Sequence, residues 1–421
     1  MYLFFMKRVF LPVLFLFFIM PARSQQKNDP WLEQLIRGQA SPFLLGVLDK
    51  PDTFQYQLIY TKIDRDKNNR PHFTNYYLHT DKDRYFNPAS TVKMPVAFCA
   101  LEKLHELDIP GLSRNTPMLT DSSYSGQISV VRDSVSANGL PSIAQYIREI
   151  FLISDNDAYN RLYEFIGQET LNKKLWQKGY TGSRITRRFM PMNEEENRHT
   201  NHIRFVQDGK TVYEQAPAYS TIAFDYSKQH LVGRAHLNRK DSLINAPMDF
   251  TTHNILLLED QQQLLQSVLF PLSVPKKQRF HLTDDDYRFL YQYMSELPRE
   301  SRYPHYDTTE YFDSYAKFFL FKAGKSKPPS YIRVFNKPGW TYGFLTDVAY
   351  IVDFKNNVEF MLSACIYVNS DGVLNDDKYD YDSIGYPFFK ETGHIIYDYE
   401  LKRPRKHIPR LEAFRLDYQD K

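Results

Sequence analysis

The clearest chemical signal in this sequence is a serine followed three positions later by a lysine. The pattern occurs four times, starting at Ser24, Ser90, Ser273 and Ser314. The copy at Ser90 opens the most apolar helical segment of the chain, and its lysine is Lys93. One helical turn apart, the two side chains share a face, so a lysine amine kept neutral by burial can take the proton of the serine hydroxyl. We therefore predict Ser90 as a nucleophile and Lys93 as its base.

Two further polar motifs follow in the chain. A Ser-Asp-Asn motif runs from Ser154 to Asn156, and a Lys-Pro-Gly motif runs from Lys337 to Gly339. In the first, a serine can relay a proton to a leaving nitrogen and an asparagine amide can hold a carbonyl. In the second, a lysine supplies positive charge and a glycine lets another backbone come close. Each motif also has an ordinary structural interpretation, the first as a helix cap and the second as a Pro-Gly turn.

Together and in this order, the three motifs resemble the signature motifs of class A β-lactamases and penicillin-binding serine hydrolases. The resemblance covers about residues 40–400, apart from an insertion. It implies that Ser90 is acylated by the substrate carbonyl while Lys93 takes its proton. It further implies that Ser154 passes a proton to the departing nitrogen.

The same resemblance assigns the substrate-binding groups. Asn156 would bind a substrate amide, and Lys337 would attract the substrate carboxylate. Gly339 would give the substrate room beside the strand. The backbone N–H groups of Ser90 and Trp340 would form the oxyanion hole, where losing one donor typically costs about 3 kcal/mol.

The sequence departs from the family at the residue that activates the hydrolytic water. Class A enzymes place a glutamate there, in a stretch of Arg-Trp-Glu-Pro type, whereas this chain reads Arg-Phe-Met-Pro with Met190 at the glutamate position. A thioether cannot accept a proton. The acidic run at Glu194, Glu195 and Glu196 is either a solvated surface or the source of another base. Without a base the acyl-enzyme should persist, unless a group such as Lys93 activates the water.

A second departure is Pro338, where the family usually has a threonine or serine whose hydroxyl binds the substrate carboxylate. The proline ring removes that donor. Thr341 is a candidate replacement, and the substrate can equally be a different ester or amide.

The composition limits the partners of this protein. The 421 residues include 53 basic and 50 acidic side chains, interspersed along the chain, so nucleic acid and anionic membranes are not expected partners. Residues 1–24 carry Lys7 and Arg8 before an apolar run, which predicts a secretory signal peptide and an exported, periplasmic protein. Cys99 and Cys365 are expected to be separate buried thiols. We expect a monomer without a cofactor. We also expect no metal site, because His199 and His202 have no third ligand at suitable spacing.

The predicted fold class is α/β (α+β): an antiparallel sheet built from both chain termini, flanked by helices, with an inserted all-helical lobe. Residues 25–421 are expected to form a single catalytic domain. Its α/β lobe covers about 25–88 and 328–400, its helical lobe about 89–327, and an insertion about 198–250. The strands are expected at 56–61, 72–79, 331–335, 345–352 and 358–368, with a hairpin at 203–215. Helices are expected at 30–38, 90–104, 255–269 and 382–399, and within 141–178.

The sequence thus predicts a serine hydrolase that forms an acyl-enzyme with a β-lactam or related amide. One alternative is a D-alanyl-D-alanine peptidase or a related penicillin-binding acyl transferase, and Met190 favours this alternative. An esterase is also possible within the enzyme class. An alternative of another class is a non-catalytic binding protein that kept the fold.

Overall fold

The computed structural model describes residues 26–418. The predicted signal peptide, residues 1–24, lies outside the described residues. The helices are α1 (Pro30–Arg37), α2 (Pro42–Leu48), α3 (Pro51–Phe54), α4 (Lys93–Leu107), α5 (Ile143–Leu152), α6 (Asn156–Ile166), α7 (Gln168–Gln177), α8 (Glu194–Arg198), α9 (Leu258–Leu269), α10 (Asp284–Ser295) and α11 (Tyr386–Lys402). The strands are β1 (Gln57–Arg65), β2 (Pro71–Leu78), β3 (Met118–Asp121), β4 (His202–Gln207), β5 (Lys210–Gln215), β6 (Leu231–Val232), β7 (Ala235–Leu237), β8 (Leu243–Ile244), β9 (Met248–Asp249), β10 (Ile332–Thr341), β11 (Phe344–Asp353), β12 (Val358–Tyr367) and β13 (Val373–Leu374).

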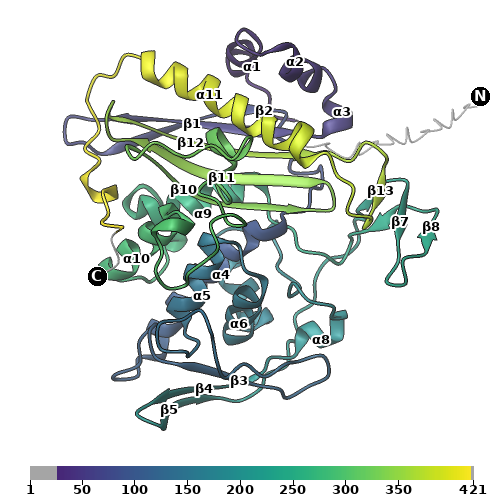
Figure 1. Ribbon diagram of the computed structural model, residues 1–421, viewed down its shortest axis with the longest axis vertical. Coiled ribbons are helices and arrows are strands. Elements are labelled where there is room, and N and C mark those ends of the chain that lie inside the picture. Colours follow the sequence, from purple (N-terminus) through teal and green to yellow (C-terminus); the bar gives the residue numbers. More distant parts are fainter. Residues whose placement is uncertain (1–25, 419–421) are drawn as a thin grey trace, which may run out of the picture.

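A five-stranded sheet in the order β10-β11-β12-β1-β2 organises the upper part of the molecule (Figure 1). Its pairs are antiparallel, and β1 from the N-terminal part lies against β12 from the C-terminal part. Strands β11 and β12 are buried along their whole length because they are central, whereas β10 and β2 form the edges. The predicted antiparallel sheet assembled from both chain termini is confirmed.

Helices cover both faces of this sheet. Helices α1, α2 and α11 pack on one face, where their apolar side chains form one core with those of the strands. On the other face, α9 and α10 pack between the sheet and part of the lobe built around α4, α5 and α6, while the turn before α4 contacts β10 and β11 directly (Figure 1). Helix α4 is almost entirely buried, as its apolar sequence predicts, and it contacts both α5 and α6. The nucleophile motif therefore opens the central helix of the lobe.

The lobe is mainly helical, but it is not the all-helical unit that the sequence predicted. A three-stranded sheet, β3-β4-β5, covers its lower end (Figure 1). Strand β3 is only four residues long, too short to show a clear alternation, and its partner β4 lies far along the chain. The hairpin β4-β5 is present as predicted, and Asp208 and Gly209 at its turn both have positive φ angles. Part of the segment 198–250 thus completes the sheet of this lobe.

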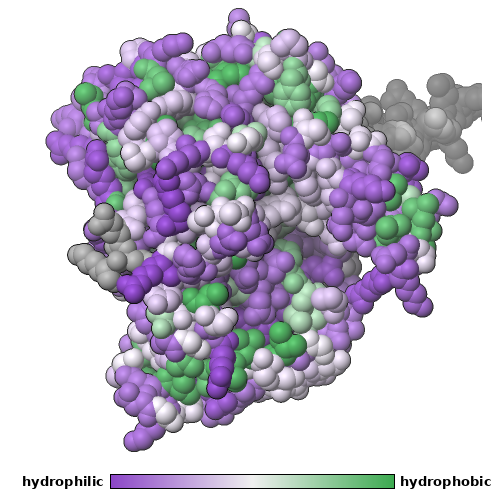
Figure 2. Space-filling model, viewed as in Figure 1, coloured by the Kyte–Doolittle hydropathy of each residue, from purple (hydrophilic) through white to green (hydrophobic). Residues whose placement is uncertain are grey.

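The rest of that segment forms short strands beside the main sheet. Strand β6 pairs with β9, while β7 lies between β13 and β8 and pairs with both. The face shown in Figure 2 is mostly hydrophilic, with small separate apolar patches, one of them over the β7-β8 hairpin. Within residues 26–418, no helix is long and apolar enough to cross a membrane. Cys99 and Cys365 are free and buried, as predicted.

Candidate active site

A short 3-10 helix, η1 (Ala89–Val92), presents Ser90 at the junction with α4. Ala89, the residue before the serine, has a φ of 46°, a conformation that costs a non-glycine residue energy and often marks a functional turn. Its backbone N–H is held by Asn87 Oδ1 at 2.9 Å. Ser90 remains half-buried while its neighbours in η1 are buried. The turn therefore exposes one hydroxyl at the start of a buried helix.

Lys93 lies one turn after Ser90, and its amine is completely buried. The Nζ atom donates to Asn156 Oδ1 at 2.7 Å, to the backbone oxygen of Ser154, and to Ser154 Oγ at 3.3 Å. Burial lowers the pKa of Lys93 to about 7, although Asp155 acts in the opposite direction. A neutral amine has two N–H donors, which the backbone oxygen of Ser154 and Asn156 Oδ1 can occupy while its lone pair stays free. Lys93 therefore has the surroundings of a general base.

Lys337 reaches the same serine from the opposite side of the site. Its Nζ atom donates to Ser154 Oγ at 2.8 Å and to the oxygen of Pro338 at 2.8 Å, and the side chain is fully buried. Burial and the nearby amine of Lys93 lower the pKa of Lys337 well below its usual value. Ser154 Oγ thus lies between two buried amines. A proton can pass through this hydroxyl between the nucleophile side and the leaving-group side of the site.

The Ser-Asp-Asn motif forms the start of α6. Ser154 has a φ of 65°, which turns its side chain toward the two lysines. Asp155 caps the helix by accepting the backbone N–H of Ala158 at 2.8 Å. Asn156 is exposed, although its oxygen is held by Lys93. Its NH₂ group is therefore available to a ligand, and the helix-cap interpretation of this motif is correct for Asp155.

Gly339 allows β10 to pass close to the nucleophile. A Cβ atom at this position would lie 2.6 Å from the backbone nitrogen of Ser90 and 3.0 Å from the oxygen of Pro88. Both are backbone atoms, which cannot move aside cheaply. The Lys-Pro-Gly motif lies inside β10 and pairs with β11, so it is not the turn between strands. The turn follows at Tyr342 and Gly343, both with positive φ.

We expect Gly339→Ala to slow acylation about 100-fold, because a shift of about 1 Å between reacting groups has an effect of that size. The rate of acyl-adduct formation would measure it. Gly46→Ala is the matched control, since a Cβ there meets no atom within 4 Å. Equal rates in the Gly339→Ala and parent proteins would contradict the close approach of β10 to Ser90.

Pro338 is accommodated because β10 is an edge strand, where a missing N–H need not cost a ladder hydrogen bond. It offers no hydroxyl to a ligand, as the sequence indicated. Thr341 lies at the end of the strand and is half-buried. Trp340 is also half-buried, and its ring packs near Tyr315 and Phe318, at centroid distances of 5.8 Å each. Side chains alternate along a strand, so Trp340 points to the opposite face of β10 from Gly339.

The loop with the missing glutamate also reaches the site. The Phe189 ring centroid lies 5.1 Å from Lys93 Nζ, and the Phe189 backbone N–H donates to Asn160 Oδ1 at 2.8 Å. Met190 is half-buried in the same loop. A side chain at position 190 therefore lies beside Phe189, whose ring forms the wall of the site over Lys93.

The acidic run after Met190 makes other contacts. Glu195 contacts His199 and Tyr219, and Glu196 caps α8 and accepts a hydrogen bond from Ser125. Within the part of the chain that is described, none of Glu194, Glu195 and Glu196 forms a hydrogen bond or ion pair with the lysines of the site.

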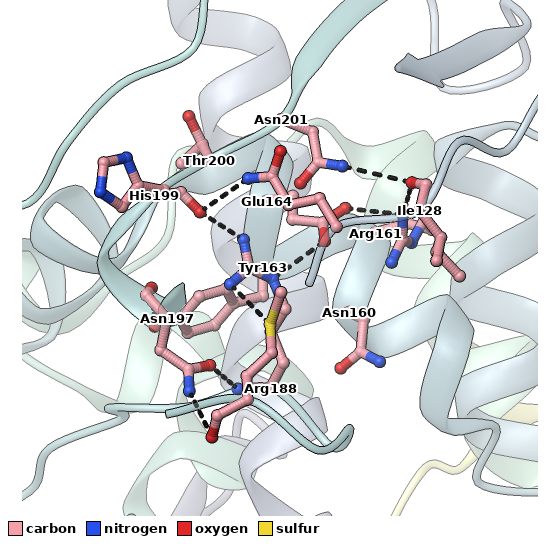
Figure 3. A network of polar contacts seen from close by, with 12 residues as sticks. Ile128, Asn160, Arg161, Tyr163, Glu164, Arg188, Asn197, His199, Thr200 and Asn201 are labelled. Carbon is pink, nitrogen blue, oxygen red and sulfur yellow. Dashed lines mark hydrogen bonds and ion pairs between the residues drawn. The ribbon is translucent and has the colours of Figure 1, made fainter. Parts of the chain in front are cut away.

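A buried ion-pair network ties this loop to α6 (Figure 3). Glu164 forms ion pairs with Arg188 Nε at 2.9 Å and with Arg161 Nη1 at 3.0 Å, and the side chains of all three are fully buried. Arg188 also donates to the backbone oxygens of Glu196 and His199, at 3.2 and 2.5 Å. Sequence reasoning missed this network. The available signal was the presence of charged residues inside a helix that is otherwise inward-facing and apolar.

Glu164→Ala is expected to lower the free energy of unfolding by about 3–5 kcal/mol, because two guanidinium groups would stay buried without their carboxylate. Urea unfolding of the purified protein would measure the change. Glu412→Ala, on the exposed surface, should leave the free energy of unfolding almost unaltered. A Glu164→Ala protein as stable as the parent would show that the network contributes little.

The structure brings together the predicted residues Ser90, Lys93, Ser154, Asn156, Lys337 and Gly339, with Trp340 next along β10. The other Ser-x-x-Lys patterns differ. Ser314 is completely buried, and Ser273 donates to the oxygen of Phe270 at 2.7 Å. The pattern at Ser24 lies outside the described residues.

The histidine pair predicted to lack a third ligand contacts separate carboxylates. His199 contacts Glu195, while His202 contacts Asp121 and Glu214. Within residues 26–418, no group of three or more His, Cys, Asp or Glu side chains is arranged to hold a metal ion.

Comparison with known proteins agrees with the resemblance seen in the motifs. A family model described as the β-lactamase enzyme family matches residues 67–216, which include Ser90, Lys93, Ser154 and Asn156 and end before Lys337. The predicted resemblance to this family is confirmed over those residues, and the fold is of the predicted mixed α/β class. No curated protein matches the chain.

Three solved structures illustrate how this chain compares with proteins of known structure in identity, TM-score and coverage. A β-lactamase from Sphaerobacter thermophilus is 12% identical, with a TM-score of 0.46, over 89% of this chain and 97% of that chain. A β-lactamase from Xanthomonas campestris is 14% identical, with a TM-score of 0.47, over 87% of this chain and 98% of that chain. An acyl-enzyme complex of a PBP-A variant with penicillin G is 12% identical, with a TM-score of 0.46, over 88% and 98% of the two chains. At such values, the assignment of site residues rests on the geometry described above.

Proposed function

We propose that this protein is a serine acyl hydrolase or transferase that forms an acyl-enzyme on Ser90 with a β-lactam or related amide. One observation carries the proposal: the buried amines of Lys93 and Lys337 both donate to Ser154 Oγ, beside the nucleophile turn. A hydrogen-bonded chain of this kind is suited to moving a proton between an attacking hydroxyl and a leaving nitrogen. Exposed lysines would not provide it, because they stay charged at neutral pH.

In the proposed acylation, Ser90 Oγ attacks the substrate carbonyl and its proton goes to neutral Lys93. The developing oxyanion would be met by the backbone N–H groups of Ser90 and Trp340, one in the first turn of a helix and the other on the edge strand. When the carbon–nitrogen bond breaks, the leaving nitrogen takes the Ser154 proton. The proton held by Lys93 then restores the Ser154 hydroxyl, so the bonds and protons balance.

Deacylation is the step for which a base is missing. Met190 favours a second candidate, a D-alanyl-D-alanine peptidase or other penicillin-binding acyl transferase, in which the acyl group persists or passes to another nucleophile. An esterase would use the same acylation step. We also propose that the protein is exported, periplasmic and monomeric, on the basis of the predicted signal peptide and the resemblance to the family.

Acylation is expected to depend on pH through Lys93. Because the pKa of this amine is lowered to about 7, the neutral, proton-accepting form prevails above that pH and is lost below it. The acylation rate should therefore level off above about pH 7 and fall about tenfold per pH unit below it. Rates of adduct formation between pH 5 and 9 would reveal the profile. A flat profile would exclude Lys93 as the base.

The intact mass of the mature protein, followed over time after mixing with benzylpenicillin, tests the proposed function. The expected result is an adduct that maps to the tryptic peptide of residues 85–93, which contains Ser90. A persistent adduct would support the penicillin-binding candidate, and rapid ring opening without a lasting adduct would support a β-lactamase. The absence of both would overturn the proposal for β-lactams and leave other amides and esters to be tested.

A further inference from the structure

A cavity of about 700 Å³ lies at the end of β10, beyond the site already described. We call it the Lys322 cavity. Residues that line it include Phe312, Tyr315, Lys322, Lys325, Trp340 and Tyr386. It thus combines flat apolar walls with two cations, in a volume that suits a small molecule or part of one.

The Lys322 amine is surrounded by aromatic rings. Its Nζ atom lies 4.3 Å from the Tyr315 ring centroid, 4.7 Å from that of Phe312 and 5.1 Å from that of Tyr386. The amine donates a hydrogen bond to the backbone oxygen of Tyr315, at 2.8 Å. A lysine ammonium has three donors, so N–H groups remain for a ligand.

The charge of Lys322 is not cancelled by a close carboxylate. Within the described residues, no ion pair joins it to an acidic side chain, although Asp382 lines the same cavity and raises its pKa. Burial has the larger effect and lowers the pKa of Lys322 to about 8, which leaves the amine mostly protonated at neutral pH. Lys325 adds a second, exposed cation, 5.0 Å from the Phe312 ring centroid. The cavity therefore favours an anion.

Trp340 connects the cavity to the nucleophile. Its ring lines the cavity, while the preceding residue, Gly339, lies against the backbone nitrogen of Ser90. Adjacent Cα atoms are 3.8 Å apart and adjacent side chains face opposite sides of a strand, so the cavity lies across β10 from the place where Gly339 meets Ser90. Because β10 is an edge strand, a ligand lying along its free edge can reach both faces.

The two groups that the family resemblance assigns to a substrate carboxylate, the lysine at 337 and a hydroxyl at 338, are not both available in this protein. Pro338 has no hydroxyl, and Lys337 is buried with its amine held by Ser154 and Pro338. We propose that the Lys322 cavity binds a carboxylate on an aromatic or apolar part of the substrate, while the scissile carbonyl lies at Ser90. This inference deepens the proposed function and rests on it for calling the ligand a substrate.

Calorimetric titration of the Ser90→Ala protein tests the inference without requiring acylation. The probes are 3-(phenylacetamido)benzoate and its carboxamide counterpart, 3-(phenylacetamido)benzamide, which differ only in the anionic group. The benzoate should bind about ten- to a hundredfold more tightly, the usual range for hydrogen bonds to charged groups. Adding Lys322→Gln should remove this preference, and adding Lys325→Gln should reduce it. Adding Lys327→Gln, an exposed neighbour outside the lining, should leave it unchanged.

Three results would overturn the inference. The first is no binding of either probe up to about 10 mM, a concentration that exceeds any useful subsite affinity. The others are equal binding of the two probes and a carboxylate preference that survives Lys322→Gln. A preference lost in Lys337→Gln and kept in Lys322→Gln would assign the carboxylate to Lys337 instead. The proposed function fails separately, by the absence of any acyl adduct on the parent protein. Such a failure would leave a measured carboxylate preference standing as binding alone.

Discussion

The Ser90→Ala protein is expected to form no adduct with benzylpenicillin and to open its ring about 10⁶-fold more slowly than the parent, a loss typical of an essential serine nucleophile. In the proposed acylation, the hydroxyl oxygen of Ser90 forms the new bond. Lys93 and Ser154 would remain in place but would have no nucleophile to activate. Intact mass and ring opening, measured on the same samples, would establish the loss.

Ser273→Ala is the matched control for this experiment. Ser273 begins another Ser-x-x-Lys pattern and is half-buried, but its hydroxyl donates to the oxygen of Phe270. The control should therefore react like the parent protein. A Ser90→Ala protein that still forms the adduct would place the nucleophile elsewhere and refute the proposed chemistry.

Local sequence patterns predicted the parts of the site that depend on nearby residues. The apolar run after Ser90 predicted a helix, and a helix places Lys93 one turn away. The strands β1, β11 and β12 followed from their apolar and β-branched residues, and the antiparallel sheet followed from strands at both ends of the chain. Motif order then supplied what local patterns could not, since Ser154 and Lys337 are 183 positions apart in the chain.

Other features depend on contacts that no local pattern encodes. The short strand β3 gains its stability from β4, a partner far along the chain, so the lobe looked wholly helical from the sequence. The burial of Glu164 and Arg161 is completed by Arg188, which comes from another segment of the chain. The motif Lys-Pro-Gly looked like a turn because proline and glycine usually mark one, yet an edge strand tolerates both. In each case tertiary contacts overrode the local signal.

Met190→Glu is expected to shorten the lifetime of the acyl-enzyme by about 10²- to 10⁴-fold, the usual contribution of a general base. Met190 follows Phe189, whose ring lies 5.1 Å from Lys93 Nζ, so a carboxylate at position 190 would lie near the site and near the Lys93 amine. The lifetime is measured by removing excess benzylpenicillin and following the adduct mass.

Met190→Gln is the matched control, because glutamine has a shape similar to that of glutamate and is also polar, but its amide cannot accept a proton. If the glutamine variant deacylated as fast as the glutamate variant, the gain would come from altered packing of the loop. If neither differed from the parent, the hydrolytic water would be activated from another position, and the absence of a glutamate at 190 would not explain a persistent adduct.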